Sequence, residues 1–141
     1  MATTTATITL TSNDISDSPI SITNQAIFTT AGTDTGITET TGLARKKFAT
    51  SGNTVLLDHG LAQGIAQDVT ADKSAKVYIR NINDRGDGTK YVTILLTAVE
   101  IGRLYGGDWM LIPWSGGSGK DVEFTASDTT ETTLEYCVFY E

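Results

Sequence analysis

Short runs in which apolar and polar residues alternate recur along this chain, separated by turn sequences. Near the N-terminus, Ile8 and Leu10 alternate with threonines, which is the pattern of a strand with one buried face. The abundance of threonine agrees with strands, because β-branched side chains suit a pleated and half-exposed surface. No stretch keeps the apolar spacing of a long helix, so the pattern restricts the chain to an all-β fold.

The alternating runs predict about nine or ten strands. They occupy residues 3–12, 20–28, 37–50 with a break near Gly42, 54–58, 75–80, 90–96, two segments of 101–114, 121–126 and 132–141. So many short strands in 141 residues predict a single-domain antiparallel β-sandwich of jelly-roll type that spans residues 1–141. Residues 1–12 are expected to form an N-terminal arm or an edge strand.

Two places along the chain give more specific expectations. Residues 75–80 and 90–96 flank a polar tip that contains glycines, which is typical of a β-hairpin. The last run carries apolar residues on both faces, because Cys137 and Phe139 lie on its second face. We therefore expect this run to be a central strand that is covered on both sides.

Residues 101–114 contain both tryptophans of the chain and a Gly-Gly turn between two apolar runs. This pattern predicts two strands joined by a tight loop, since glycine tolerates the positive φ that such turns require. Tyr105, Trp109 and Trp114 suit the end of a core, a subunit contact or a platform for sugar stacking. The surrounding residues favour core or subunit contact over sugar binding, because nothing in the stretch is typical of an active site.

The chain is acidic, with a net charge of −7. Binding to nucleic acid needs Lys and Arg to displace phosphate counterions, so we expect no nucleic-acid partner. No apolar run approaches the length of a membrane span, and the N-terminus lacks the basic start and apolar run of a signal peptide. The expectation is a protein that is made in a cytoplasm and binds no membrane.

The residue types of the chain give little support for catalysis or for metal binding. His59 and Cys137 are the only histidine and the only cysteine, which leaves no recognisable nucleophile–base motif and too few ligands for a zinc site. A lone cysteine in an apolar strand is most simply a small buried residue. We expect a protein without enzymatic activity, cofactor or metal, and a hydrolase with an unrecognised pair of carboxylates is the weakest alternative.

Five motifs point to a family: GLARK at residues 42–46, AKVYIRN at 75–81, IGRLYGGDW at 101–109, PW at 113–114 and LEYCVFYE at 134–141. Together they resemble small β-rich structural proteins of tailed bacteriophages, chiefly of marine and cyanobacterial phages. The resemblance covers the C-terminal half of the chain well and the N-terminal half loosely. It implies a virion component of the head or the tail, and it transfers no binding residues.

The resemblance and the composition favour a decoration or cement protein of the phage head, made in the host cytoplasm. Such a protein would bind the major capsid protein or other virion proteins and act as a homo-oligomer, a dimer or a trimer. The alternatives are a tail or fibre-junction protein and a carbohydrate-binding module that uses Tyr105, Trp109 and Trp114. The interface candidates are those three aromatic residues together with Ile8 and Leu10 of the arm, which can add a strand to a partner's sheet.

Overall fold

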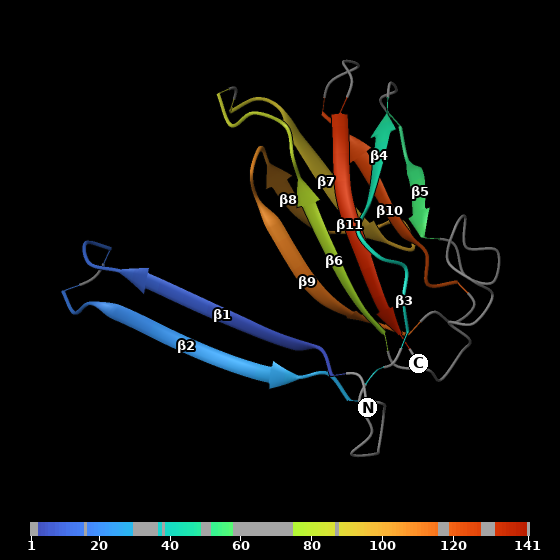
Figure 1. The fold of residues 1–141 in the computed structure, drawn as a ribbon. Coiled ribbons are helices and arrows are strands. Elements are labelled where there is room, and N and C mark those ends of the chain that lie inside the picture. Colours follow the sequence, from blue (N-terminus) through green and yellow to red (C-terminus); the bar gives the residue numbers. More distant parts are fainter. Residues whose placement is uncertain are drawn as a thin grey trace. The chain divides into compact units, whose positions relative to one another are not determined.

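The computed structural model describes residues 3–15, 17–29, 37, 39–48, 52–57, 75–86, 88–115, 119–127 and 132–140. These residues form eleven strands (Figure 1), and none of them belongs to a helix. The chain divides into two compact units, Met1–Thr38 and Glu39–Glu141. Among the residues that the structure places, there is no helix with the length and hydropathy that crossing a membrane requires.

The first unit contains a two-stranded antiparallel sheet, formed by β1 (Thr5–Ser12) and β2 (Ile20–Ile27). Leu10 lies opposite Ile22 in its register, and Ile8 lies opposite Asn24. The chain turns after β1 because Asn and Asp residues follow this strand, and their side chains favour turns by bonding to nearby backbone groups. The segment expected as an arm over residues 1–12 is therefore one strand of a hairpin that extends to Ile27.

The second unit contains two antiparallel sheets. The four-stranded sheet has the order β5 (Thr54–Leu57), β10 (Val122–Ala126), β7 (Tyr91–Leu96) and β8 (Val99–Tyr105). The five-stranded sheet contains β9 (Trp109–Trp114), then β6 (Ala75–Asn81), then β11 (Thr132–Tyr140), whose other edge pairs with β3 (Glu39–Thr40) and β4 (Ala44–Phe48).

The strand pairs of this unit are nested in the sequence. β7 pairs with β8, β6 with β9, β5 with β10, and β4 with β11, so each pair encloses the one before it. The pairs β6–β11 and β7–β10 then join these ribbons into the two sheets. Only the connection from β7 to β8 stays within one sheet; every other connection from β4 to β11 passes to the opposite sheet.

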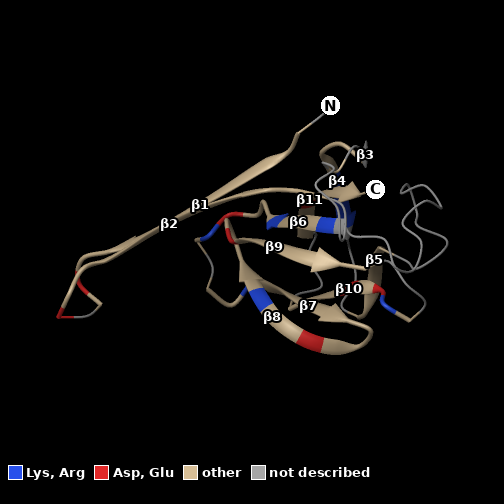
Figure 2. Cartoon of the chain, turned by 90° about the horizontal axis from the view of Figure 1, so that it is seen from below, with Lys and Arg blue, Asp and Glu red and all other residues tan. Residues whose placement is uncertain are grey.

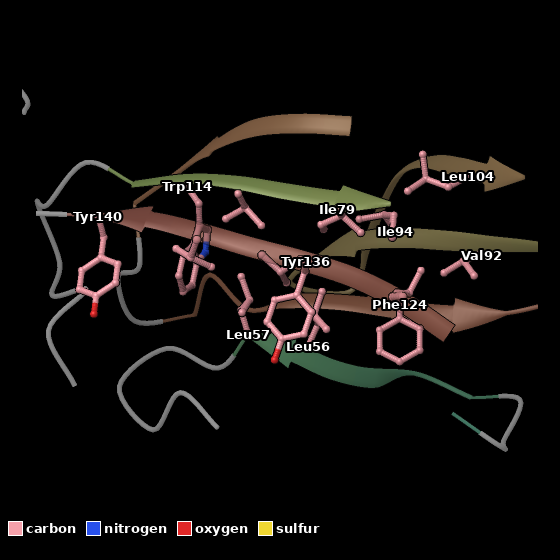
Figure 3. Close-up of a cluster of buried hydrophobic side chains, with 14 residues drawn as sticks. Leu56, Leu57, Ile79, Val92, Ile94, Leu104, Trp114, Phe124, Tyr136 and Tyr140 are labelled. Carbon is pink, nitrogen blue, oxygen red and sulfur yellow. The ribbon is translucent and has the colours of Figure 1, made fainter. Parts of the chain in front are cut away.

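The two sheets bury a shared core between them (Figure 3). Every second residue of each strand points inward, as the alternation of buried and half-buried residues along β10 illustrates. The expected antiparallel β-sandwich is therefore confirmed. Its core consists of Leu56, Leu57, Val92, Ile94, Leu104, Val122 and Phe124 of the four-stranded sheet and Val77, Ile79, Trp114, Leu134, Tyr136, Val138 and Tyr140 of the five-stranded sheet.

The β-hairpin expected for residues 75–96 is wrong. β6 pairs with β9 and β11, whereas β7 pairs with β8 and β10, so the polar tip between them crosses from one sheet to the other. Hairpin partners and strands that face each other across a core have the same alternating pattern, because each buries every second residue in both arrangements. Val77 and Val92 accordingly belong to the same core but not to a shared ladder.

The expectation of a central last strand is confirmed. β11 pairs with β6 on one side and with β3 and β4 on the other. All residues from Leu134 to Val138 are buried, which shows that both faces of the strand are covered. Cys137 is a buried free cysteine, as its apolar surroundings in the sequence indicate.

Candidate functional site

The stretch that holds both tryptophans forms a corner between the two sheets. β8 ends at Tyr105 in one sheet and β9 begins at Trp109 in the other. A Cβ atom on Gly106 would lie 2.3 Å from the carbonyl oxygen of Asp84, which leaves no room for any side chain. The next residue, Gly107, has a φ of +85°, a backbone conformation that other residues rarely adopt. The glycine pair is therefore required by the path of the chain.

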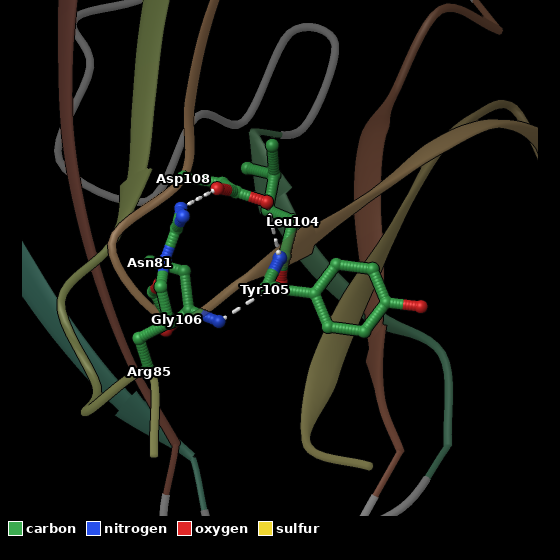
Figure 4. A network of polar contacts seen from close by, with 6 residues as sticks. All are labelled: Asn81, Arg85, Leu104, Tyr105, Gly106 and Asp108. Carbon is green, nitrogen blue, oxygen red and sulfur yellow. Dashed lines mark hydrogen bonds and ion pairs between the residues drawn. The ribbon is translucent and has the colours of Figure 1, made fainter. Parts of the chain in front are cut away.

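Asn81 holds this corner from the inside. Its side-chain amide donates to the carbonyl oxygen of Leu104 at 3.0 Å (Figure 4). Its side-chain oxygen accepts from the backbone N–H of Asn83 at 3.1 Å. Its backbone accepts from Gly107 and donates to the carbonyl oxygen of Asp108, at 2.8 and 3.0 Å. Asn81 is fully buried, so these bonds replace the water that its amide has lost.

Arg85 and Asp108 hold the same corner from the outside. Arg85 donates from Nε to the carbonyl oxygen of Gly106 at 2.9 Å and forms an ion pair with Asp108 (Figure 4). The Asp108 carboxylate also accepts from the backbone N–H of Tyr105 at 3.0 Å. The charged groups of the corner thus bind backbone or each other, and we infer a structural role for the corner.

The three aromatic candidates lie in three different environments. Trp114 is 6% exposed, lies in the core and donates from Nε1 to the carbonyl oxygen of Lys120 at 2.6 Å. Trp109 is 50% exposed on β9, with its ring centroid 6.4 Å from that of Tyr78 on β6. Tyr105 is 38% exposed on the other sheet, where its ring lies 5.4 Å from that of Tyr91. The structure therefore does not bring the three rings into one sugar-binding platform.

Tyr105 belongs to a small cluster on the outer face of the four-stranded sheet. The guanidinium of Arg103 lies over the ring of Tyr91, 4.6 Å from its centroid, and pairs with Glu100 at 3.2 Å. Tyr91 and, to a smaller extent, Glu100 raise the pKa of Arg103, because negative charge beside the guanidinium favours its protonated form. Tyrosine and arginine are enriched in protein interfaces, so this cluster is a candidate contact surface.

Ile8 and Leu10 lie on one face of the hairpin. The register places them on the same side as Ile20 and Ile22, whereas threonines occupy the other face of β1. Leu10 and Ile22 are both exposed, and neither strand contains a charged residue. An isolated two-stranded hairpin is marginal in water, and an apolar face on such a hairpin favours contact with another surface.

Within the described ranges, no group of His, Cys, Asp and Glu side chains could hold a metal ion. The acidic side chain that is buried, Glu135, accepts from Nε of Arg45 at 3.0 Å. His59 lies outside the residues that the structure describes.

Two functional features are not visible in the sequence pattern. Asn81 lies at an inward-facing position at the end of an alternating strand. The signal in the sequence that could have indicated its role is a polar residue at a position where the alternation predicts an apolar one. The second feature is a row of charged residues across the outer face of the five-stranded sheet, which forms only when Arg45, Arg80 and Glu135 become neighbours through strand pairing.

Comparison of the chain with protein-family models, with curated proteins and with solved structures gives no match.

Proposed function

We propose that the chain is a non-enzymatic structural protein of a phage virion, and specifically a decoration or cement protein that binds and stabilises the head. It would contact the major capsid protein or other virion proteins and act as a homo-oligomer. The observation that carries the proposal is the combination of a β-sandwich with a separate, uncharged hairpin that has one apolar face.

We also propose that the sandwich is a jelly roll. Its support is the nesting of four strand pairs, β7–β8 inside β6–β9 inside β5–β10 inside β4–β11, because a jelly roll is a long antiparallel ribbon wrapped into two sheets. Viral capsid domains and lectins use this architecture, and so do other proteins. The topology therefore adds to the proposal by analogy of fold alone.

The hairpin gives the proposal its attachment element. The strands of a hairpin can extend a partner's sheet through their outer edges, and the apolar side chains then add contact area. Decoration proteins act by multiplying many weak contacts over a symmetric shell, so a small uncharged element in each copy is sufficient for attachment. The polar side chains of the corner, Asn81, Arg85 and Asp108, bind the backbone of the sandwich, and this supports a structural task for the corner.

The test is the number of copies of this chain in purified virions, measured by quantitative mass spectrometry. A head decoration protein is expected in hundreds of copies, and a tail or fibre-junction protein in tens or fewer. Absence of the chain from virions would overturn the proposal. The double variant Leu10→Ser with Ile22→Ser is expected to lose attachment, whereas Thr9→Ser with Thr23→Ser, a pair on the opposite face of the hairpin, should still attach.

The carbohydrate-binding alternative keeps one observation in its favour, the exposed Trp109 beside Tyr78. A glycan array separates it from the virion proposal. Binding to a defined glycan that is lost in Trp109→Ala, with folding intact, would favour the sugar-binding function.

A further inference from the structure

The two outer faces of the sandwich carry rows of opposite charge. Across the five-stranded sheet, strand pairing places side by side four residues: Trp109 of β9, Arg80 of β6, Glu135 of β11 and Arg45 of β4. Glu135 is buried and bound by Arg45, whereas the Arg45 side chain is 65% exposed and Arg80 is also exposed. The same face carries Lys47 and Lys76, so basic residues dominate it in a chain whose net charge is −7.

The four-stranded sheet has a matching row. Pairing places side by side Val55 of β5, Glu123 of β10, Leu95 of β7 and Glu100 of β8. Glu123 is half-buried and Glu100 is exposed, and Val55 at the end of the row is exposed as well. Figure 2 shows basic segments on β6 in one layer, and one basic and one acidic band on β8 in the other.

We propose that the outer face of the five-stranded sheet binds the outer face of the four-stranded sheet in a second copy of this chain. The contact is heterologous, because each copy uses two different surfaces. Repeated from copy to copy, the contact builds an open stack and does not close into a dimer or trimer. It rests on the proposed function only for the expectation that copies meet.

The spacing of the charges supports this contact. Arg80 and Arg45 are separated by one intervening strand, β11, and Glu123 and Glu100 are separated by β7. Neighbouring strands lie about 4.8 Å apart, so both pairs of charges have a separation of about 10 Å. The two arginines of one copy therefore match the spacing of the two glutamates of another, and in the contact Arg45 and Glu100 would also keep their ion pairs with Glu135 and Arg103.

The order of the rows fixes which residues meet. When Arg80 faces Glu123 and Arg45 faces Glu100, Trp109 faces Val55, and the already neutralised Glu135 faces Leu95. Two of the four positions then pair opposite charges and Trp109 meets the exposed Val55, whereas Glu135 and Leu95 are already buried in each copy. β8 and β9 lie at one side of the sandwich and β4 and β5 at the other (Figures 1 and 2), so a half-turn of the second copy about the normal to the sheets produces this alignment.

The neighbouring rows agree with the same alignment. Beyond the charged row, β7 and β8 carry Thr93, Arg103 and then the pair Tyr91–Tyr105. In the proposed alignment, β7 of one copy lies over β11 of the other and runs along it from Glu135 toward Phe139. In this direction, Tyr91 faces Phe139.

The size of the contact predicts a weak association. Four strands and three rows of residues cover about 20 Å by 20 Å, which is roughly 400 Å² of projected area. Stable interfaces bury about 800 Å² on each partner. The pure chain should therefore associate reversibly, and the contact becomes effective where many copies are held close together.

Sedimentation velocity of the full-length chain tests the proposal without a virion. The wild-type chain is expected to associate in low salt and to dissociate as salt screens the charges, from about 0.05 to about 0.5 M. Arg80→Glu alone and Glu123→Lys alone should each lower the association constant by about tenfold or more, because each places like charges together. Mixing the two variants should restore association for two reasons. The unchanged Glu123 face of Arg80→Glu can bind the unchanged Arg80 face of Glu123→Lys, and the charges introduced at positions 80 and 123 are also complementary.

The design also covers failure of the charge reversals to fold. Circular dichroism checks each variant, and Arg80→Gln with Glu123→Gln, which keep the side-chain size, should each weaken association as well. A wild-type chain that stays monomeric at about 100 µM in low salt, or variants whose mixture associates no better than either alone, would overturn the proposal. Neither result would affect the copy number in virions, so the two proposals fail separately.

Discussion

The side-chain amide of Asn81, at the end of β6, donates to the carbonyl oxygen of Leu104 on β8 at 3.0 Å. The bond joins the two sheets at the end of the sandwich where the chain turns its corner. Removing the amide would leave the buried Leu104 oxygen without this donor and would also take the acceptor from the part-buried N–H of Asn83.

We therefore predict that Asn81→Ala lowers the free energy of unfolding by about 2–3 kcal/mol. Urea unfolding measures the change. Asn53→Ala is the matched control, because Asn53 is exposed and accepts its bond from Thr125 at the surface, and it should change stability by about 0.5 kcal/mol or less. Equal effects of the two substitutions would contradict a structural role for Asn81.

A second prediction concerns the glycines of β8 and the corner. Gly106→Ala should destabilise the protein by about 3 kcal/mol, because the new methyl group would overlap the backbone of Asp84. Gly102→Ala should leave stability unchanged or slightly higher, since no atom lies within 4 Å of its Cβ position. The melting temperatures of the two variants measure the contrast, and a well-tolerated Gly106→Ala would show that the corner can open.

The turn between β7 and β8 stores backbone strain. Thr97 and Ala98 have φ values of +49° and +62°, in a region that side chains disfavour. Ala98→Gly should raise the free energy of unfolding by about 0.5 kcal/mol, the relief of strain less the greater freedom of glycine in the unfolded chain. Ala126→Gly, a buried strand position, should lower it by about 1 kcal/mol. Chemical denaturation of both variants measures whether the free energy of unfolding rises or falls. A loss of stability in Ala98→Gly would contradict the proposed strain at this turn.

The two tryptophans should differ in both energy and spectrum. Trp114→Ala should cost about 3–5 kcal/mol because it empties part of the core, whereas Trp109→Ala should cost about 1 kcal/mol or less. Single-tryptophan proteins made by Trp→Phe substitution allow a check by fluorescence. The emission of Trp109 should be quenched by iodide and that of Trp114 should not; equal quenching would contradict the burial of Trp114.

The alternation of residue types was enough to predict the strands but not their partners. The break near Gly42 divides one expected run into β3 and β4, and the apolar second face of β11 predicts its central position. The pairing of β6 and β7 was mispredicted, because a strand's pattern records which side is buried and not which strand lies beside it.

The candidate surfaces were predictable only in part. The apolar positions Ile8 and Leu10 follow from periodicity, and the structure places them in one strand of a hairpin. The separation of Tyr105, Trp109 and Trp114 was not predictable, because residues close in sequence diverge when a turn sends β8 and β9 to different sheets. The row of Arg45, Arg80 and Glu135 was equally hidden, since its members come from three distant strands.

The nesting of strand pairs has a consequence for the way the chain reaches its fold. The innermost pair, β7 and β8, is joined by two residues, whereas the outermost pair brings Arg45 to Glu135 across 90 positions. Closing that loop first would cost far more chain entropy than extending a ribbon that has already formed. Assembly should start at the strained turn and proceed outward, so that β4 and β11 pair last and folding is slow, as expected for a topology rich in long-range contacts.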